Sequence, residues 1–168
     1  MYRWLIINDF ILGMNRTFKF TLLIIIVLLC DISYSQRNIE IITENNLNFG
    51  DAYMGYSTTV NHADAGAAKF RIRQNIRGNP YLSVTLTLPT NLVNGSYSIP
   101  VIFDAATTAW SYNDLPAGRI NFDPNSLLVT RLQRNDYLYI WLGGVINVPT
   151  NIVTGVYSST ITITITIL

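Results

Sequence analysis

The chain has 168 residues, of which 12% are charged and 49% are hydrophobic, and its formal net charge is +1. A balance this close to neutral provides no electrostatic field that would attract nucleic acid or an acidic lipid surface. Cys30 is the only cysteine and His62 the only histidine, so the chain has neither a thiol pair for an internal disulfide nor a Cys/His set for zinc.

An export signal is predicted over residues 14–35. A short basic stretch precedes an eleven-residue apolar run, residues 20–30, and small residues follow at Ser33 and Ser35. This order is typical of a signal peptide, and it places cleavage before Gln36. Because eleven residues are too few to cross the hydrocarbon core as a helix, we expect no membrane span after cleavage.

Cleavage leaves residues 36–168, which we expect to form a single exported domain in the periplasm, at the cell surface or outside the cell. Residues 1–13 precede Met14, and we interpret them as a misassigned start. A lipid anchor at Cys30 stays open as an alternative, although Leu29 stands where lipoprotein signals normally carry a small residue.

The exported part alternates short apolar runs with turn residues about every ten positions, without a convincing helical pattern. This spacing predicts an all-β fold, a sandwich or a barrel. The first expected strand, residues 39–43, places Ile39 and Ile41 on one face. Asn94-Gly95 predicts a two-residue hairpin because both residues tolerate positive φ, and Gly143-Gly144 predicts a second tight hairpin.

The C-terminal run Thr160–Leu168 alternates isoleucine and threonine, the period of a half-buried strand. We expect its isoleucines to belong to the core. If the strand begins at Val156, it is about twice the usual strand length. Such a strand either crosses a corner of the fold or pairs with two partners.

Aromatic residues are the main candidate for recognition. Tyr137, Tyr139 and Trp141 share one face of the run 137–142. An exposed stripe of this kind would be a stacking platform for sugar rings or for a partner, whereas the alternative is a central strand buried on both faces. A basic stripe, which we interpret as a solvated strand face, is formed by Lys69, Arg71 and Arg73.

Catalytic chemistry has little support. His62 could act as a general base with Asp64, but it lies in a small-residue loop, where a solvated histidine is the simpler interpretation. Oxygen ligands for calcium are present at Asp104, Asp114 and Asp123, but aspartates in such loops usually shape turns. We therefore predict no enzyme, no cofactor and no metal site.

Several short motifs follow one another along the exported part: Leu47-Asn48-Phe49-Gly50, Ala67-Ala68-Lys69-Phe70, Leu88-Pro89, Gly143-Gly144 and Gly155-Val156-Tyr157-Ser158-Ser159-Thr160. In this order and spacing they resemble a bacterial secreted family of unknown function, domain-of-unknown-function family 4402. The Gly-x-Tyr ending is also similar to spore coat protein U and the pilin-like subunits related to it. Residues 56–60 depart from the family pattern, because they only approximate its Gly-Thr-Val step.

This resemblance implies an immunoglobulin-like antiparallel β-sandwich that assembles at the bacterial surface by donating a strand to a neighbour. The expected function is a structural or adhesive subunit whose partners are further copies or other surface subunits. The segment with Ile39 and Ile41 is the candidate donor, and the alternative is that it forms the domain's own first strand. A second hypothesis is a secreted ligand- or carbohydrate-binding module that uses the aromatic stripe or the loop 104–118.

Overall fold

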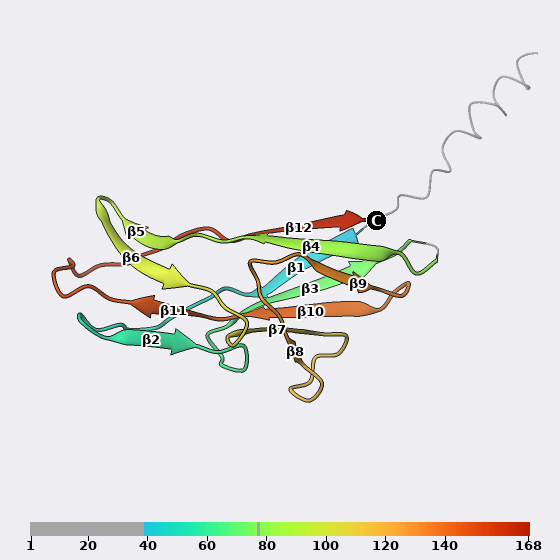
Figure 1. The fold of residues 1–168 in the computed structure, drawn as a ribbon, viewed down its shortest axis with the longest axis horizontal. Helices are drawn as coiled ribbons and strands as arrows, with labels where there is room; N and C mark the ends of the chain where they lie inside the picture. Colours follow the sequence, from blue (N-terminus) through green and yellow to red (C-terminus); the bar gives the residue numbers. More distant parts are fainter. Residues whose placement is uncertain (1–38, 77) are drawn as a thin grey trace, which may run out of the picture. The chain divides into compact units, whose positions relative to one another are not determined.

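The structure is a computed structural model that describes residues 39–76 and 78–168 (Figure 1). Within these ranges it contains twelve β-strands and no helix, which confirms the all-β class predicted from the sequence. It follows that none of the described residues belongs to a helix that could cross a bilayer. The predicted export signal over 14–35, residues 1–13 and Cys30 lie outside the described residues.

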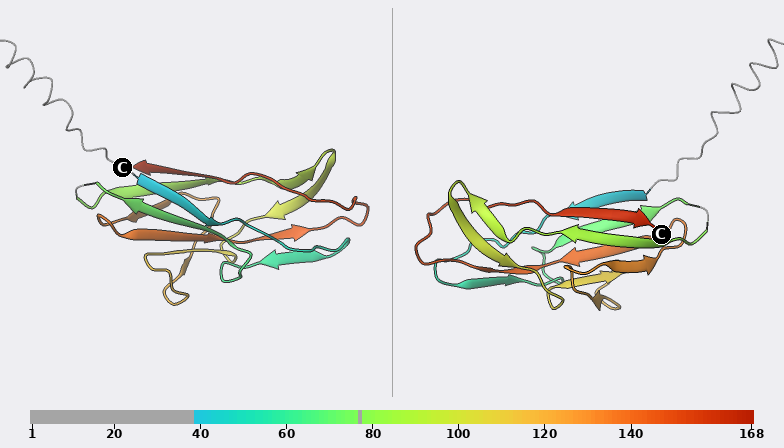
Figure 2. Two further views of the ribbon diagram at one scale, coloured as in Figure 1. Left: turned by 180° about the vertical axis from the view of Figure 1, so that it is seen from behind. Right: turned by 45° about the horizontal axis from the view of Figure 1, so that its top comes forward.

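The strands belong to one compact unit, Arg37–Leu168. Their bounds are β1 Ile39–Asn45, β2 Ser57–Val60, β3 Ala68–Gln74, β4 Tyr81–Thr87, β5 Asn91–Asn94, β6 Tyr97–Ile102, β7 Thr108–Ser111, β8 Ile120–Asn121, β9 Leu128–Arg131, β10 Tyr137–Leu142, β11 Gly144–Asn147 and β12 Thr162–Ile167. A five-stranded sheet has the order β1-β3-β10-β7-β8, a four-stranded sheet β2-β11-β6-β5, and a three-stranded sheet β12-β4-β9. The three-stranded sheet lies over the five-stranded sheet and forms an antiparallel β-sandwich (Figures 1 and 2).

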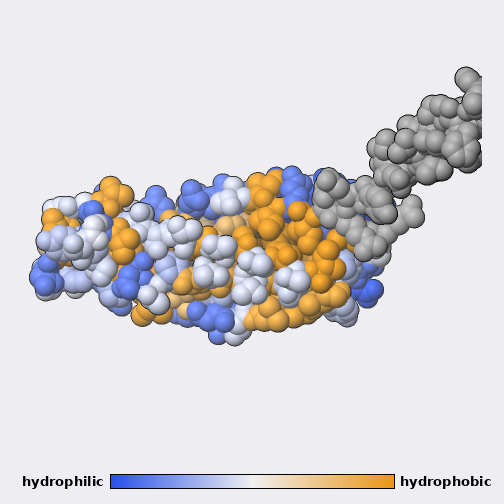
Figure 3. Space-filling model, turned by 90° about the horizontal axis from the view of Figure 1, so that it is seen from above, coloured by the Kyte–Doolittle hydropathy of each residue, from blue (hydrophilic) through white to orange (hydrophobic). Residues whose placement is uncertain are grey.

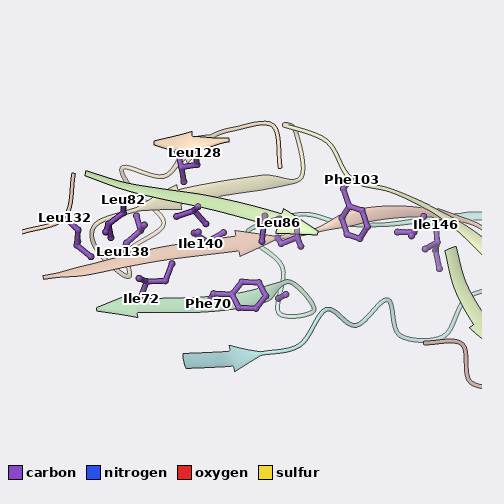
Figure 4. Packing of buried hydrophobic residues seen from close by; sticks show 14 of the residues in the cluster. Phe70, Ile72, Leu82, Leu86, Phe103, Leu128, Leu132, Leu138, Ile140 and Ile146 are labelled. Atoms are coloured by element: carbon purple, nitrogen blue, oxygen red, sulfur yellow. The ribbon is translucent and has the colours of Figure 1, made fainter. Parts of the chain in front are cut away.

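The main core lies between these two layers, where side chains of β4 point toward those of β3 and β10 (Figure 4). The period of two decides which residues enter it. In β10, Leu138, Ile140 and Leu142 are 0% exposed. Full burial of such side chains stabilises the fold by about 1.5–3 kcal/mol each, as an upper estimate.

The predicted hairpin at Gly143-Gly144 is wrong. β10 and β11 do not pair with each other, because the chain leaves the five-stranded sheet and enters the four-stranded one. Gly143 lies at the crossing, where its N–H donates to the carbonyl oxygen of Thr107 at 2.9 Å. A Cβ atom at Gly143 would overlap the carbonyl oxygen of Val60. Glycine is therefore needed here for the close approach of three backbones and not for a turn.

The other predicted hairpin is present but is displaced by one residue. Asn94 of β5 lies opposite Tyr97 of β6, so the two-residue loop is Gly95-Ser96. Gly95 has a φ of 58°, a conformation that glycine adopts at little cost.

The C-terminal segment pairs with two partners, which is one of the two alternatives predicted for a strand of this length. The other alternative was a strand that crosses a corner of the fold. β12 is antiparallel to β4, with Ile163 opposite Leu86. Upstream, Ser158 and Val93 of β5 exchange two backbone hydrogen bonds, of 2.9 and 3.1 Å. The isoleucines of β12 thus lie beside the apolar residues of β4 on the same face of the three-stranded sheet.

The N-terminal strand pairs within its own domain. β1 is antiparallel to β3, with Ile41 opposite Ile72, and a bulge interrupts the register between Thr43 and Asn45. Ile39 packs against the core from the edge of the five-stranded sheet. In this single copy, the segment therefore pairs as the domain's own first strand.

Candidate functional site

The predicted aromatic stripe lies on the face of the five-stranded sheet that points away from the core. The ring centroids of Tyr137 and Tyr139 are 6.0 Å apart, and those of Tyr139 and Trp141 are 5.8 Å apart. The second pair is stacked, with an interplanar angle of 21°. We call Tyr137, Tyr139 and Trp141 the aromatic ladder.

Cationic side chains cover the aromatic ladder. The register of β3 against β10 places the basic stripe directly beside the rings, pairing Arg73 with Tyr137, Arg71 with Tyr139 and Lys69 with Trp141. The Lys69 ammonium group is 5.4 Å from the centre of the Tyr139 ring, and the Arg119 guanidinium carbon is 3.9 Å from the centre of a Trp141 ring. Both distances allow cation–π attraction. Two stripes that are far apart in the sequence therefore form one layered surface.

Two carboxylates fix the position of these cations. Lys69 Nζ is 2.8 Å from a Glu44 oxygen and 2.7 Å from an Asp114 oxygen. Arg71 Nε is 2.8 Å from the other Glu44 oxygen. Burial alone would lower the pKa of Lys69, but its hydrogen bonds to Asp114 and Glu44 outweigh burial and raise that pKa above its ordinary value.

The ring faces of the aromatic ladder are largely covered and are not open to a ligand. Trp141 is only 4% exposed, and Tyr137 and Tyr139 are half-buried. Burial, together with the charge of Asp114, raises the pKa of the Tyr139 hydroxyl. This arrangement agrees with the alternative of a central strand buried on both faces, because cations occupy the ring faces on which a sugar would stack. Sequence reasoning missed Arg119, whose loop position gives no sign of its contact with Trp141.

The imidazole Nδ1 of His62, the catalytic candidate, forms no hydrogen bond with Asp64. The Asp64 carboxylate accepts a hydrogen bond from the N–H of Asn61 at 2.7 Å and so stabilises the local turn. Arg119 donates to the His62 carbonyl oxygen at 2.7 Å. Burial, and then the charge of Arg119, lowers the pKa of the His62 imidazole. The surroundings of His62 therefore favour its neutral form.

The three aspartates considered for calcium have structural partners. Asp104 accepts a hydrogen bond from the N–H of Thr107 at 3.0 Å, and Asp123 accepts one from the N–H of Asn125 at 3.0 Å. The bonds from Asn125 lower the pKa of Asp123. Asp114 belongs to the ion cluster on the aromatic ladder. Over residues 39–76 and 78–168, no group of three or more His, Cys, Asp or Glu is placed to hold a metal ion.

The open side of the sandwich is the second candidate surface. β1 and β12 are edge strands of two different sheets, and they run along the same side of the unit (Figures 1 and 2). Apolar side chains lie between them: Ile163 and Ile165 are half-buried, while Ile41 is 40% and Ile167 is 42% exposed. We call this side the seam. Figure 3, a view onto this side, shows apolar surface gathered there.

A groove of about 780 Å³ also lies between the segments that flank these strands. Its walls are residues 46–54 and 152–161, which have no regular secondary structure. The buried residues that line it are all apolar, namely Ala68, Phe70, Ile99, Phe103, Ile146 and Val148. Sequence reasoning missed the groove, because its walls follow no period. The available signal was the pair of motifs 47–50 and 155–160, which both line it.

Backbone hydrogen bonds join each wall of the groove to another segment of the domain. The N–H of Asn48 donates to the carbonyl oxygen of Gly66 at 2.8 Å. On the opposite wall, the N–H of Ser158 donates to the carbonyl oxygen of Val93 in β5 at 3.1 Å. The groove is therefore bounded by anchored segments and not by free loops.

The chain was compared with models of protein families, with curated proteins and with solved structures, and none of them matches it. The resemblance to family 4402 and to the pilin-like subunits stays a prediction.

Proposed function

We propose that this chain is an exported structural or adhesive subunit of the bacterial surface, which joins its partners by strand addition at the seam. The seam is the observation that carries the proposal. An edge strand offers unpaired backbone N–H and C=O groups, so an added strand gains main-chain hydrogen bonds. The half-buried isoleucines of β12, Ile163 and Ile165, would lose further contact with water, which adds a hydrophobic contribution.

In this proposal the N-terminal strand β1 is not the donated strand. Ile39 and Ile41 were the candidate donor residues, but β1 already pairs with β3 in the same domain. In this proposal cleavage falls before Gln36, so that residues 36–38 precede β1. The subunit is therefore proposed to offer its own edges and not its N-terminus.

Two further points support a structural role. The antiparallel sandwich is the architecture implied by the resemblance to pilin-like subunits, which is immunoglobulin-like. The aromatic ladder, the best candidate for carbohydrate stacking, is covered by Lys69 and Arg119. A carbohydrate-binding module would need those ring faces open.

The full chain, expressed in a bacterium with its own leader, tests the proposal. We expect a processed protein that begins at Gln36, lies outside the cytoplasm, is digested when protease is added to intact cells, and forms cross-linked species larger than a monomer on the cell. Retention in the cytoplasm would contradict export. An exported protein that stays monomeric on the cell and melts reversibly would favour the binding module.

A further inference from the structure

We infer that β12 is a self-association edge: β12 of one copy pairs antiparallel with β12 of a second copy, about a twofold axis at Ile165. The two three-stranded sheets then become one continuous sheet. The inference rests on the proposed function, because it names the edge and the partner of the proposed strand addition.

The hydrogen-bonding phase of β12 shows which backbone groups are free. The N–H of Leu168 donates to the carbonyl oxygen of Tyr81 at 2.9 Å, and the register on β4 continues without a shift from there to Thr162. Hydrogen-bonded pairs in an antiparallel ladder recur at every second residue. The threonines therefore direct their backbone groups to β4. The residues whose N–H and C=O groups face the free edge are Ile163, Ile165 and Ile167.

No charged side chain protects this edge. Proteins usually guard exposed edge strands with charged residues, prolines, bulges or short length. β12 has six residues, all isoleucine or threonine, and no charged residue follows Asp136 in the chain. The remaining long edge, β1, carries Glu40 and Glu44 and is interrupted by a bulge.

The other edges are shorter. β9 has four residues and ends in Arg131, β8 has two residues, and β2 has four. β5 also has four residues, and its outer side is bridged to Ser158. Among the edges that the structure describes, β12 is therefore the one that combines length, regular register and absence of charge.

The sequence of β12 is complementary to itself. A twofold axis at Ile165 places Ile163 opposite Ile167 and Thr164 opposite Thr166 of the second copy. Each isoleucine then faces an isoleucine across a hydrogen-bonded pair. Thr164 and Thr166 face each other at the closer, non-hydrogen-bonded positions, and Thr162 lies opposite Leu168. Pairs of β-branched residues and Thr–Thr pairs both stabilise antiparallel strands. Because the interface is isologous, it closes as a dimer.

The test places like charges across the expected interface. Thr164 and Thr166 are exposed on the outer face of β12, so a T164K/T166K variant leaves the core unchanged. The matched control, T85K/T87K, places the same charges at exposed positions of β4, one strand inward. All proteins are expressed as the full chain, recovered after processing by the host and measured by sedimentation. We expect a dimer for the wild type and the control. The T164K/T166K variant is expected to be monomeric, with a dissociation constant at least about tenfold higher.

Charge exchange and hydrogen exchange separate an interface effect from a folding effect. A T164E/T166E variant is expected to be monomeric alone and to form a mixed dimer with T164K/T166K, since each lysine then faces a glutamate. In the wild type, the amides of Ile163 and Ile165 are expected to exchange slowly. In the lysine variant these amides should exchange fast, while those of Thr164 and Thr166 remain protected by β4.

Three results would overturn the inference: a monomeric wild type, a dimer that survives T164K/T166K, or fast exchange at the Ile163 and Ile165 amides in the wild-type protein. The last measurement decides the matter even if the lysine variant fails to fold. Proposed function and inference can fail separately. Surface-exposed assemblies that persist in the T164K/T166K strain would refute the β12 edge alone, whereas a dimer confined to the cytoplasm would refute the surface role alone.

Discussion

The outer face of the five-stranded sheet and the free edge of β12 differ in how they present β-structure to solvent. The outer face carries a closed layer of cations over aromatic rings, held by Glu44 and Asp114. The edge of β12 carries no charged side chain. The comparison shows that the domain places ionic groups over the outer face of the five-stranded sheet. The free edge of β12 has no such groups, so another strand can pair with it.

Removal of β12 should have the largest effect on the stability of the domain. Deletion of Ser159–Leu168 would remove the strand paired with β4 and the isoleucines that pack against the flank of the core, and we expect the remaining chain to show no cooperative unfolding transition. The point variant Ile163→Asp would place a carboxylate against Leu86, at a cost of about 3 kcal/mol or more. Thermal melts followed by circular dichroism measure both effects.

The matched control for this prediction lies on the other face of the same strand. Thr164→Asp introduces the same carboxylate at an exposed position, so the free energy of unfolding should change by only about 0.5 kcal/mol. A cooperative melt of the truncated protein, or equal losses for the two aspartate variants, would show that the isoleucine face of β12 does not belong to the core.

Substitution of Gly143 tests the close approach of three backbones after the end of β10. In Gly143→Ala the new Cβ would overlap the Val60 carbonyl oxygen, so we expect a loss of about 3 kcal/mol. Gly144→Ala is the control, because its Cβ would be 3.1 Å from the Ile102 carbonyl oxygen and could be accommodated by a small shift. Urea titration gives both free energies of unfolding. Equal losses would mean that the crossing of the backbones at Gly143 is not as close as described.

Arg119 tests the cover of the aromatic ladder. We expect Arg119→Ala to lose about 1 kcal/mol, because its guanidinium lies 3.9 Å from a Trp141 ring centre. A double-mutant cycle with Trp141→Ala should give a coupling energy of similar size. Arg134→Ala, which removes an exposed arginine bonded to Asn75, serves as the control and should have a smaller effect. Additive losses in the cycle would show that the cation and the ring do not interact.

The pH dependence of stability should be the smallest effect. The pKa values of Lys69 and Tyr139 are both raised in the folded protein. A raised pKa stabilises the fold at low pH, and this stabilisation is lost as pH rises from the unfolded pKa through the folded one. The free energy of unfolding should therefore fall above about pH 10, and Tyr139→Phe should make this fall with pH less steep. Urea melts at increasing pH measure the free energy of unfolding. Equal dependence on pH in the wild type and in Tyr139→Phe would contradict the prediction.

The parts of the fold with a strict period could be predicted from the sequence. Alternation in residues 68–73 and 160–168 predicted both strands and their inward faces. In β12 the inward isoleucines are only partly buried: Ile163 and Ile165 pack against the core, whereas Ile167 is 42% exposed. Local chemistry also sufficed at Asn94-Gly95, to within one residue. At Gly143-Gly144 it failed, because a glycine pair is required equally by a tight turn and by the crossing of three backbones, and the sequence does not distinguish the two.

The candidate surfaces could not be assembled from the sequence, because they depend on pairing between distant segments. The basic and aromatic stripes were visible separately, but only the register of Lys69 against Trp141 shows that one covers the other. The same holds for the seam, since nothing in Ile39–Asn45 or Thr162–Ile167 indicates that both strands lie at edges. Arg119 has no pattern of its own, and its role follows from tertiary contacts alone.

The alternation of isoleucine and threonine in β12 has a consequence for alignment. A slide of β12 along β4 by two residues would return isoleucine to core positions and threonine to outer ones, so the repeat by itself does not select one alignment. The choice falls to the non-repeating ends. Two backbone contacts outside the repeat set the register of β12 on β4. They are the bridge between Ser158 and Val93 and the hydrogen bond from Leu168 to Tyr81.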